Sequence, residues 1–280
     1  MKKIRKVVIT AAGSGSRLLP FSKETPKEML PFCVKSKEGK PILKPILEVI
    51  YESLYDYGYK EFCFVVGRGK RSIEDYFLVD DSNSKYAKNK DLQDFYKKIQ
   101  DSHITYVQQS SPKGFGDAVL KAKLFVGKDS FLLHAGDDII LSPNNDHLKR
   151  LEEAFFSNDA DLAFLVTKMK DPRPYGVIEG KKIDNGIIEV ENLEEKPKHP
   201  KTNLAVIATY LFKPSIFQEL EKIKPDKKGE IQLAAAVKSL ILKGKAVAVE
   251  LKTNEKRVDV GTPESYVACI NDSFRSLMKT

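Results

Sequence analysis

The sequence has few of the residues from which disulfide frameworks, metal clusters and catalytic triads are built. Its 280 residues include three cysteines, four histidines and no tryptophan. The cysteines are odd in number and far apart: Cys33, Cys63 and Cys269. This pattern fits neither a disulfide framework nor a metal cluster, and Cys63, in the apolar run 62–66, is expected in the core. The histidines are not spaced for a metal site or a triad: His103, His134, His147 and His199.

The sequence also lacks a long hydrophobic run. No apolar segment approaches the roughly 20 residues that a membrane-spanning helix needs. The basic start, residues 1–6, leads directly into Val7, Val8 and Ile9, which predicts a first strand rather than a signal peptide. Hydrophobic residues make up 41% and charged residues 31%, so a folded domain is expected. We therefore expect a cytoplasmic protein with no membrane partner.

The net charge of +8 indicates either a solvated, lysine-rich surface or an anionic ligand. Charge alone does not choose between nucleic acid and a nucleoside triphosphate. A nucleic-acid-binding protein would carry clustered basic residues with aromatic side chains for stacking. Here lysine and arginine are dispersed and interleaved with aspartate and glutamate, so no nucleic-acid partner is expected.

The first half of the chain alternates between expected strands and helices. The strands are 5–10, 61–66, 104–108 and 131–134, and the helices are 41–57, 72–77 and 117–125. This alternation predicts an α/β fold with a doubly wound, mostly parallel sheet. Ligands of such sheets bind at the carboxyl ends of the strands, where the loops 11–18, 108–116 and 136–138 follow. Residues 78–102 are polar and predict either an exposed helical excursion or a loop.

The pattern changes after about residue 160. Short strands are expected over 162–167, 176–179, 187–190 and 204–212, and amphipathic helices over 231–242 and 263–277. Asp184, Asn185 and Gly186 indicate a hairpin turn between two of these strands. The sequence shows no linker, so we expect one continuous domain over 1–280 that includes a smaller β-rich lobe.

A glycine-rich loop, residues 11–18, follows the first strand directly. Small residues allow the backbone N–H groups to approach phosphate oxygens, and Arg17 adds a bidentate donor. The loop is not a P-loop, because no Gly-Lys-Ser/Thr follows at the required spacing. A dinucleotide-binding fold would carry a third glycine where Leu18 stands. A lone Gly-x-Gly is a weak signal, so the residues that follow decide its meaning.

The stretch AAGSGSRLLPFSKETPKEMLP, residues 11–31, resembles the signature of sugar-phosphate nucleotidylyltransferases. Its Pro-Lys-Glu-Met-Leu-Pro ending is similar to that of the bacterial-type UTP–glucose-1-phosphate uridylyltransferases, whereas thymidylyl relatives usually read Ser-Lys-Gln. Further matches follow in order, so that the resemblance spans about residues 5–270. It implies a Rossmann-like, glycosyltransferase-A-like fold. Gln108 departs from the arginine usual in bacterial uridylyltransferases, and 78–102 matches nothing in the family.

The resemblance implies specific roles for residues of the nucleotide half of the site. Arg17 and Lys27 would be the catalytic cations that offset charge on the phosphates. The residues implied to bind the nucleotide are Ala11, Ala12, Gly13, Gly15, Glu28, Gln109 and Gly114. Gln109 would bond the uracil edge, and the backbone of Gly114 would lie close to it.

The resemblance also implies a metal and a sugar-phosphate site. Asp137, in Gly136-Asp137-Asp138, and Asp259, in Val258-Asp259-Val260-Gly261, would bind Mg²⁺, a hard cation that prefers carboxylate oxygens. The residues implied to bind the sugar phosphate are Gly176, Glu195, Lys196, Asn203 and Glu230. The nucleotide-binding part would then cover about 1–160, the sugar-phosphate part about 161–262, and a C-terminal helix about 263–280.

The implied activity is the transfer of UMP from UTP to glucose 1-phosphate, giving UDP-glucose and pyrophosphate. Two alternatives stay open within and beyond this class. The first is a thymidylyltransferase, or an enzyme that accepts both UTP and dTTP. Such an enzyme would differ only in how it distinguishes uracil from thymine, two bases that differ by one methyl group. A catalytically inactive regulatory subunit is disfavoured because Arg17, Lys27, Asp137, Lys196 and Asp259 are all present. Relatives form dimers or tetramers, so a homodimer or homotetramer is expected.

Overall fold

Strand β1 (Lys6–Ala11) lies inside a nine-stranded sheet whose order is β5-β4-β1-β6-β11-β8-β12-β10-β9 in the computed structural model, which describes residues 3–80 and 88–278. β4 (Glu61–Gly67) and β6 (Phe131–Ala135) flank β1 in parallel, and β5 (His103–Gln109) pairs in parallel with β4. β11 (Leu204–Phe212) runs antiparallel to β6 and continues the sheet into the second half of the chain. The α/β fold predicted from the sequence is confirmed.

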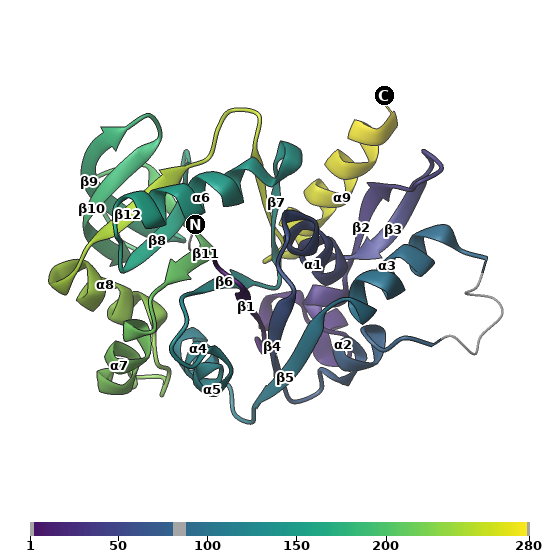
Figure 1. Cartoon of the computed structure of the whole chain (residues 1–280), viewed down its shortest axis with the longest axis horizontal. Coiled ribbons are helices and arrows are strands. Elements are labelled where there is room, and N and C mark those ends of the chain that lie inside the picture. Colours follow the sequence, from purple (N-terminus) through teal and green to yellow (C-terminus); the bar gives the residue numbers. More distant parts are fainter. Residues whose placement is uncertain (1–2, 81–87, 279–280) are drawn as a thin grey trace.

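The strands of the second half belong to the same sheet. β8 (Leu162–Lys168) pairs in parallel with β12 (Ala246–Glu250), while β9 (Gly176–Asp184) and β10 (Ile187–Glu195) form an antiparallel hairpin. The hairpin turns where Asp184, Asn185 and Gly186 predict a turn. Figure 1 shows β9 and β10 at one end of the molecule and the β2–β3 hairpin at the other.

Helices cover both faces of the sheet because successive strand residues point to opposite sides. On β1, Val7 and Ile9 belong to one buried cluster and Val8 to the other. The first cluster includes residues of α1 (Ile46–Tyr57), α3 (Lys90–Gln100) and α6 (Asp146–Ser157). The second includes residues of α4 (Phe115–Lys121), α7 (Ser215–Lys222) and α8 (Leu233–Lys243). The continuous apolar strands of the sequence are explained by this double burial.

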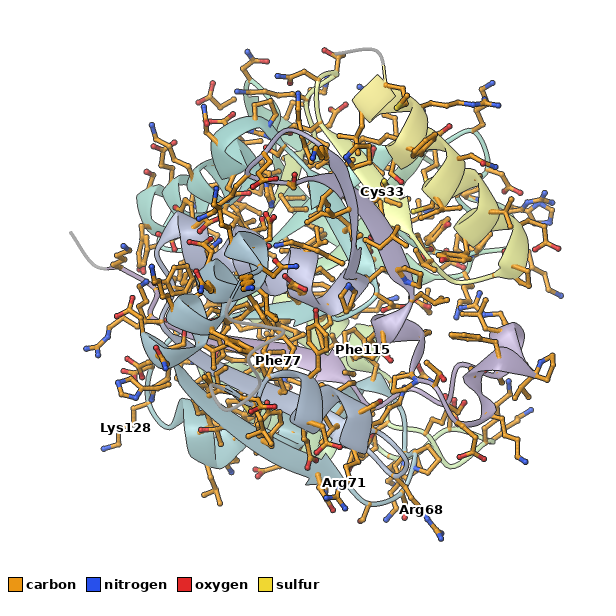
Figure 2. The ribbon with its side chains drawn as sticks, turned by 90° about the vertical axis from the view of Figure 1, so that its right-hand side faces the viewer. Cys33, Arg68, Arg71, Phe77, Phe115 and Lys128 are labelled. Atoms are coloured by element: carbon orange, nitrogen blue, oxygen red, sulfur yellow. The ribbon has the colours of Figure 1, made fainter. Side chains whose placement is uncertain are left out.

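Two small antiparallel sheets accompany the large one. β2 (Pro31–Lys35) pairs with β3 (Pro41–Pro45), and β7 (Asp138–Leu141) pairs with β13 (Lys256–Asp259). Helix α9 (Pro263–Met278) packs on β2, where the Tyr266 hydroxyl donates to the Pro31 carbonyl at 3.1 Å. Figure 2 shows Cys33 of β2 beside α9, buried in this contact.

The expected helix over 41–57 is partly wrong. Residues 41–45 form β3, and the helix begins at Ile46. Pro41 and Pro45 bound this strand, and the residue before a proline is biased toward extended backbone, which keeps Lys44 out of the helix. The backbone N–H of Ile46 donates instead to the Leu30 carbonyl at 3.0 Å.

Other boundaries differ in smaller ways. The helix expected over 117–125 is divided into α4 and α5 (Lys123–Val126) at Ala122, and 72–77 is α2 (Arg71–Tyr76). Of the polar segment 78–102, residues 90–100 form α3, and 81–87 lie outside the described residues. The sequence analysis missed several elements: β2, β3, β7, β12, β13, α6 and α7.

Candidate active site

A cleft of about 800 Å³ lies at the carboxyl ends of β1, β5 and β6, where the sequence predicts ligand binding. Most of the residues implied by the family resemblance line it: Ala12, Gly13, Arg17, Lys27, Glu28, Gln109, Gly114, Asp137, Gly176, Glu195, Lys196, Glu230 and Asp259. These residues come from eight separate segments of the chain, so only the fold brings them together.

Three implied site residues lie outside the lining of this cleft. Ala11 is buried at the end of β1, with 1% of its surface exposed. The carbonyl of Gly15 accepts a bond of 2.7 Å from the Ser22 hydroxyl, which ties the glycine-rich loop to the turn that follows it. Asn203 is exposed, and its carbonyl accepts from the Met169 N–H at 3.0 Å. In this structure the side chain of Asn203 is not part of the cleft.

Lys27 points across the cleft at the first of the two implied metal ligands. It begins a short 3₁₀ turn, Lys27–Met29, that follows Pro26, and its Nζ forms an ion pair with Oδ2 of Asp137. Burial opposes the charge on Lys27, but the carboxylates of Asp137 and Glu28 outweigh it and raise the pKa of Lys27. Lys27 is therefore fully charged at neutral pH, as a phosphate ligand must be.

Glu28 lines the cleft but is almost fully buried. Only 1% of its side chain is exposed, and Oε2 accepts from Nζ of Lys70 at 2.8 Å. Burial raises the pKa of Glu28, and the charges of Lys70 and Lys27 counteract this effect. The sequence reading placed Glu28 beside the nucleoside but did not anticipate this partner, which lies at the end of the loop after β4.

Gln109 is fixed by two acceptors at the end of β5. Its Nε2 donates to Oδ2 of Asp117 at 2.8 Å and to the Gly114 carbonyl at 3.1 Å. Both partners only accept, so the amide nitrogen is assigned to their side and the amide oxygen to the other. Gly114, at φ 92°, allows the loop to lie against residues 230 and 231, because a Cβ there would come within 2.8 Å of the Ile231 carbonyl. The loop after β5 thereby packs closely against the segment that precedes α8.

The two implied metal ligands come from the small β7–β13 pair. Asp137 precedes β7, and Asp259, the last residue of β13, pairs with Asp138. Both carboxylates line the cleft, and Arg17 and Asp259 both border Gly261. Among the described residues, no group of three or more His, Cys, Asp or Glu is arranged as a metal cage. Two carboxylates facing a cleft fit Mg²⁺, which usually keeps waters and takes phosphate oxygens as its remaining ligands.

The sequence reading missed Arg257, and it considered Asp138 only as a less certain neighbour of Asp137 in the Gly136-Asp137-Asp138 motif. The Arg257 guanidinium binds both oxygens of Asp138, with Nε at 2.8 and 2.9 Å, and Nη2 lies 3.5 Å from Oδ2 of Asp259. Burial raises the pKa of Asp138 to about 6, although Arg257 acts to lower it. The guanidinium also lies 4.7 Å from the ring centroid of Tyr175, whose hydroxyl donates to Asp259 at 3.3 Å. The sequence did contain a signal for Arg257, because this residue lies two positions before the implied metal ligand Asp259 on the same strand.

Three of the residues that the resemblance implies for sugar-phosphate binding lie on or next to β9 and β10: Gly176, Glu195 and Lys196. Gly176 pairs with Glu195 across the hairpin, and a Cβ on Gly176 would lie 3.2 Å from Oε2 of Glu195. Lys196 adopts a positive φ of 50°, and its N–H donates to the Tyr175 carbonyl at 3.0 Å. Its Nζ lies 3.3 Å from Oε1 of Glu195, and 66% of its side chain is exposed. The Lys196 ammonium is therefore exposed enough to be reached by an anionic ligand.

A cleft at the carboxyl edge of a doubly wound sheet, in which cations face paired carboxylates, suits an enzyme that transfers phosphorylated groups. The comparison with known families agrees. A family model described as "Nucleotidyl transferase" matches residues 6–275. The chain therefore belongs to the nucleotidyl transferase family.

Individual relatives are similar over nearly their whole length. The chain is 32% identical over 285 residues to a UTP–glucose-1-phosphate uridylyltransferase of Pseudomonas aeruginosa, covering 99% of this chain and 98% of that one. It is 36% identical to UTP–glucose-1-phosphate uridylyltransferase 2 of Streptococcus pyogenes, covering 93% and 87%. A crystal structure of UDP-glucose pyrophosphorylase complexed with UDP-glucose matches with a TM-score of 0.86 and 31% identity, over 98% and 100% of the two chains.

Over residues 3–80 and 88–278, none of the helices combines the length and the apolar composition that crossing a membrane requires.

Proposed function

We propose that this chain is a UTP–glucose-1-phosphate uridylyltransferase, which transfers UMP from UTP to glucose 1-phosphate and releases pyrophosphate. The relatives that carry this name cover nearly the whole chain. The observation that carries the proposal is the convergence in one cleft of the cations Arg17, Lys27 and Lys196 with the carboxylates Asp137 and Asp259. This is the set of charges that two phosphorylated substrates require.

The reaction joins two anions, so the cleft must hold them together against their repulsion. A phosphate oxygen of glucose 1-phosphate attacks the α-phosphorus of UTP in line, the new P–O bond forms, and the bond to pyrophosphate breaks. Lys27 and Arg17 offset the charge on the transferring and leaving phosphates, and Lys196 binds the sugar phosphate. The attacking phosphate is already deprotonated at neutral pH, so the step needs neither a general base nor a covalent intermediate.

Asp137 and Asp259 are the residues that would hold Mg²⁺. When bound, Mg²⁺ would supply positive charge to the phosphate oxygens. The hard-oxygen donors and the opening of both carboxylates to the cleft support this assignment.

The remaining cleft residues divide between the two substrates. Ala12, Gly13, Glu28, Gln109 and Gly114 form the nucleotide side, and Gly176, Glu195, Lys196 and Glu230 the sugar-phosphate side. We accordingly assign residues 1–160 to nucleotide binding, 161–262 to sugar-phosphate binding and 263–280 to a C-terminal helix. Ala11, Gly15 and Asn203, outside the lining, would act through the backbone or after movement of their loops.

We propose a cytoplasmic homodimer or homotetramer without nucleic-acid or membrane partners. Helix α9 carries exposed apolar side chains that suit a contact between copies: Val267 (54% exposed), Phe274 (47%) and Met278 (66%). The exposed basic residues Arg68 and Arg71 extend outward near each other at the lower edge of Figure 2, and Lys128 extends outward on its left side. Because lysine and arginine are interleaved with aspartate and glutamate along the chain, we propose no nucleic-acid partner.

The test is pyrophosphate release by the purified protein with Mg²⁺, with five nucleoside triphosphates (UTP, dTTP, GTP, ATP and CTP) each paired with the 1-phosphates of glucose, galactose, mannose and N-acetylglucosamine. Release mainly with UTP and glucose 1-phosphate is expected. A preference for dTTP would keep the mechanism and change the nucleotide specificity. No release with any pair, from folded and metal-replete protein, would favour an inactive regulatory subunit.

A further inference from the structure

Three carboxylates and one arginine meet at the β7–β13 pair, beside the cleft. The ladder sets Asp259 directly opposite Asp138, and Asp137 is the next residue along the chain. Arg257 lies two positions before Asp259, so both side chains project from the same face of β13. A divalent cation that binds at the β7–β13 pair would therefore face three carboxylates, one more than the two proposed as its ligands.

The Arg257 guanidinium lies closer to the carboxylate of Asp138 than to that of Asp259. Its Nε lies 2.8 Å from Oδ1 and 2.9 Å from Oδ2 of Asp138, and its Nη2 lies 2.8 Å from Oδ2. The contact of Nη2 with Asp259 is longer, at 3.5 Å. Asp138 is 2% exposed, so both of its oxygens are occupied away from solvent. Asp259 retains 32% exposure of its side chain and faces the cleft.

We propose that Arg257 and Asp138 are positioning residues for the metal site, because each prevents the other from interfering with it. Arg257 neutralises Asp138 and keeps it from becoming a third ligand. Asp138 in turn holds the guanidinium, which would otherwise move onto Asp259 and compete with the metal. The inference rests on the proposed function, which assigns the metal to Asp137 and Asp259.

The proposal predicts opposite effects of two substitutions on metal affinity. Asp138→Asn frees the guanidinium to pair with Asp259 and should weaken metal binding by roughly tenfold. Arg257→Met removes the competing charge and should tighten binding several-fold. The double variant removes both charges and should return close to the wild-type affinity, which is the signature of direct coupling between the two residues.

Mn²⁺ binding to the nucleotide-free protein, followed by the electron paramagnetic resonance signal of free Mn²⁺, measures this affinity without turnover. Arg150→Met is the matched control. Arg150 forms a buried ion pair with Glu255 and donates to the Glu250 carbonyl at 2.9 Å, near the opposite end of the same strand pair. This variant should lose thermal stability but keep the wild-type Mn²⁺ affinity.

Each possible outcome bears on the proposal. Opposite shifts for the single variants, with recovery in the double variant, support it. Weakening by both single variants, or by Arg150→Met as well, would show a merely structural ion pair and overturn it. The double variant guards against misfolding, because removing both members of a buried ion pair is tolerated far better than removing one. If the wild-type protein binds no Mn²⁺ at concentrations that support turnover, the inference fails, while pyrophosphate release judges the proposed function separately.

Discussion

Nζ of Lys27 is paired with Oδ2 of Asp137, so the cation proposed to bind phosphate and a carboxylate proposed to bind the metal neutralise each other. Both side chains are largely shielded, with 16% and 19% exposure. Binding of a metal–nucleotide complex would give each group a new partner, the phosphates for Lys27 and the metal for Asp137. The pair thus keeps both charges in place for the reaction.

Lys27→Met should lower kcat by about 10²–10³-fold, the typical cost of removing one preorganised charge from a developing phosphate transition state. The methionine keeps most of the side-chain volume, so the fold should be preserved. Pyrophosphate release under saturating substrates measures the effect. Lys23→Met, in the same segment but exposed and paired with the exposed Glu24, should retain wild-type turnover. A near-normal kcat for Lys27→Met would remove Lys27 from the catalytic step.

Lys196→Ala should raise the KM for glucose 1-phosphate by at least tenfold and leave UTP binding within about twofold. The reason is that Lys196 lines the cleft directly after β10, on the segment proposed to bind the sugar phosphate. Steady-state kinetics with each substrate varied, together with calorimetric UTP binding, separate the two effects. Lys198→Ala, an exposed lysine two residues on, is the control and should change neither value. An equal loss of UTP affinity in Lys196→Ala would contradict this division of the cleft.

Asp117→Asn should reduce the preference for UTP over CTP by roughly tenfold, because discrimination of a hydrogen-bonding pattern depends on fixed polar groups. Asp117 can only accept, so it orients the Gln109 amide with its oxygen available to accept from N3–H of uracil. Asparagine at 117 can also donate, which lets the amide turn over and suit cytosine, whose N3 is an acceptor. The ratio of kcat/KM values for the two nucleotides measures this. Lys121→Met, which removes only the 3.7 Å charge partner of Asp117, should keep the wild-type ratio.

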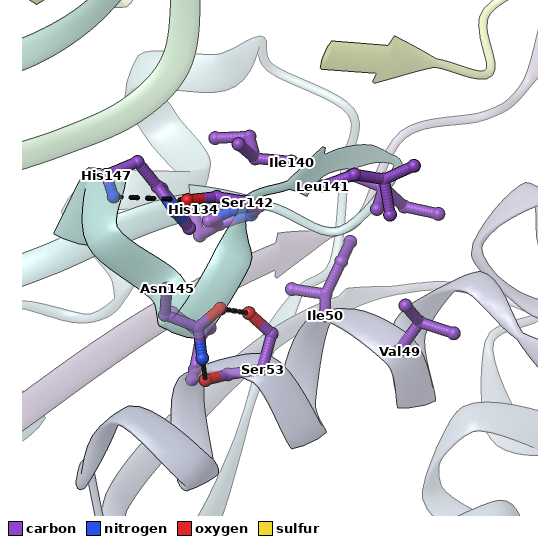
Figure 3. A pocket seen from close by; sticks show the side chains of 11 residues that line it. Val49, Ile50, Ser53, His134, Ile140, Leu141, Ser142, Asn145 and His147 are labelled. Atoms are coloured by element: carbon purple, nitrogen blue, oxygen red, sulfur yellow. Dashed lines mark hydrogen bonds between the residues drawn. The ribbon is translucent and has the colours of Figure 1, made fainter. Parts of the chain in front are cut away.

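Two buried histidines should make the protein less stable in mild acid. Burial lowers the pKa of His134 and of His147 from the usual 6.5 to about 4. Figure 3 shows both lining a pocket between α1 and the β7 region, and Nδ1 of His147 is buried without a hydrogen-bond partner among the residues that the structure describes. The unfolded chain binds these protons first, so the stabilisation is complete above pH 6.5 and is lost as the pH falls toward 4. The loss should be on the order of 3 kcal/mol per histidine.

Urea unfolding at several pH values between 7.5 and 4.5 tests this dependence. His147→Gln should flatten the decline, and the same substitution at the exposed His103 should leave its slope unchanged. Asp138, with its pKa raised to about 6, contributes in the opposite direction, so slopes are compared between variants rather than read from one curve. Identical slopes for wild type and His147→Gln would refute the assignment.

The sequence predicted much of the fold because strands buried on both faces leave a continuous apolar signature. Val7 to Ile9 and the run 62–66 needed no tertiary information to be recognised. The strands β7 and β13 were missed because each has only four residues, and β13 carries one apolar residue among them. The strand β3 was missed because the prolines at 41 and 45 suit the start of a helix as well as an extended edge.

The sequence alone determined the family, since the ordered motifs at 11–31, 108–118, 136–138 and 194–197 carry the small, basic and acidic residues that phosphate chemistry requires. It also determined the α/β alternation, because hydrophobic periodicity is a local property. Tertiary structure decided which charges meet: Lys27 with Asp137, Glu28 with Lys70, and Arg257 with Asp138. Those partners lie 42 to 119 residues apart in the chain. Such pairing depends on strand order and register, which no local pattern encodes.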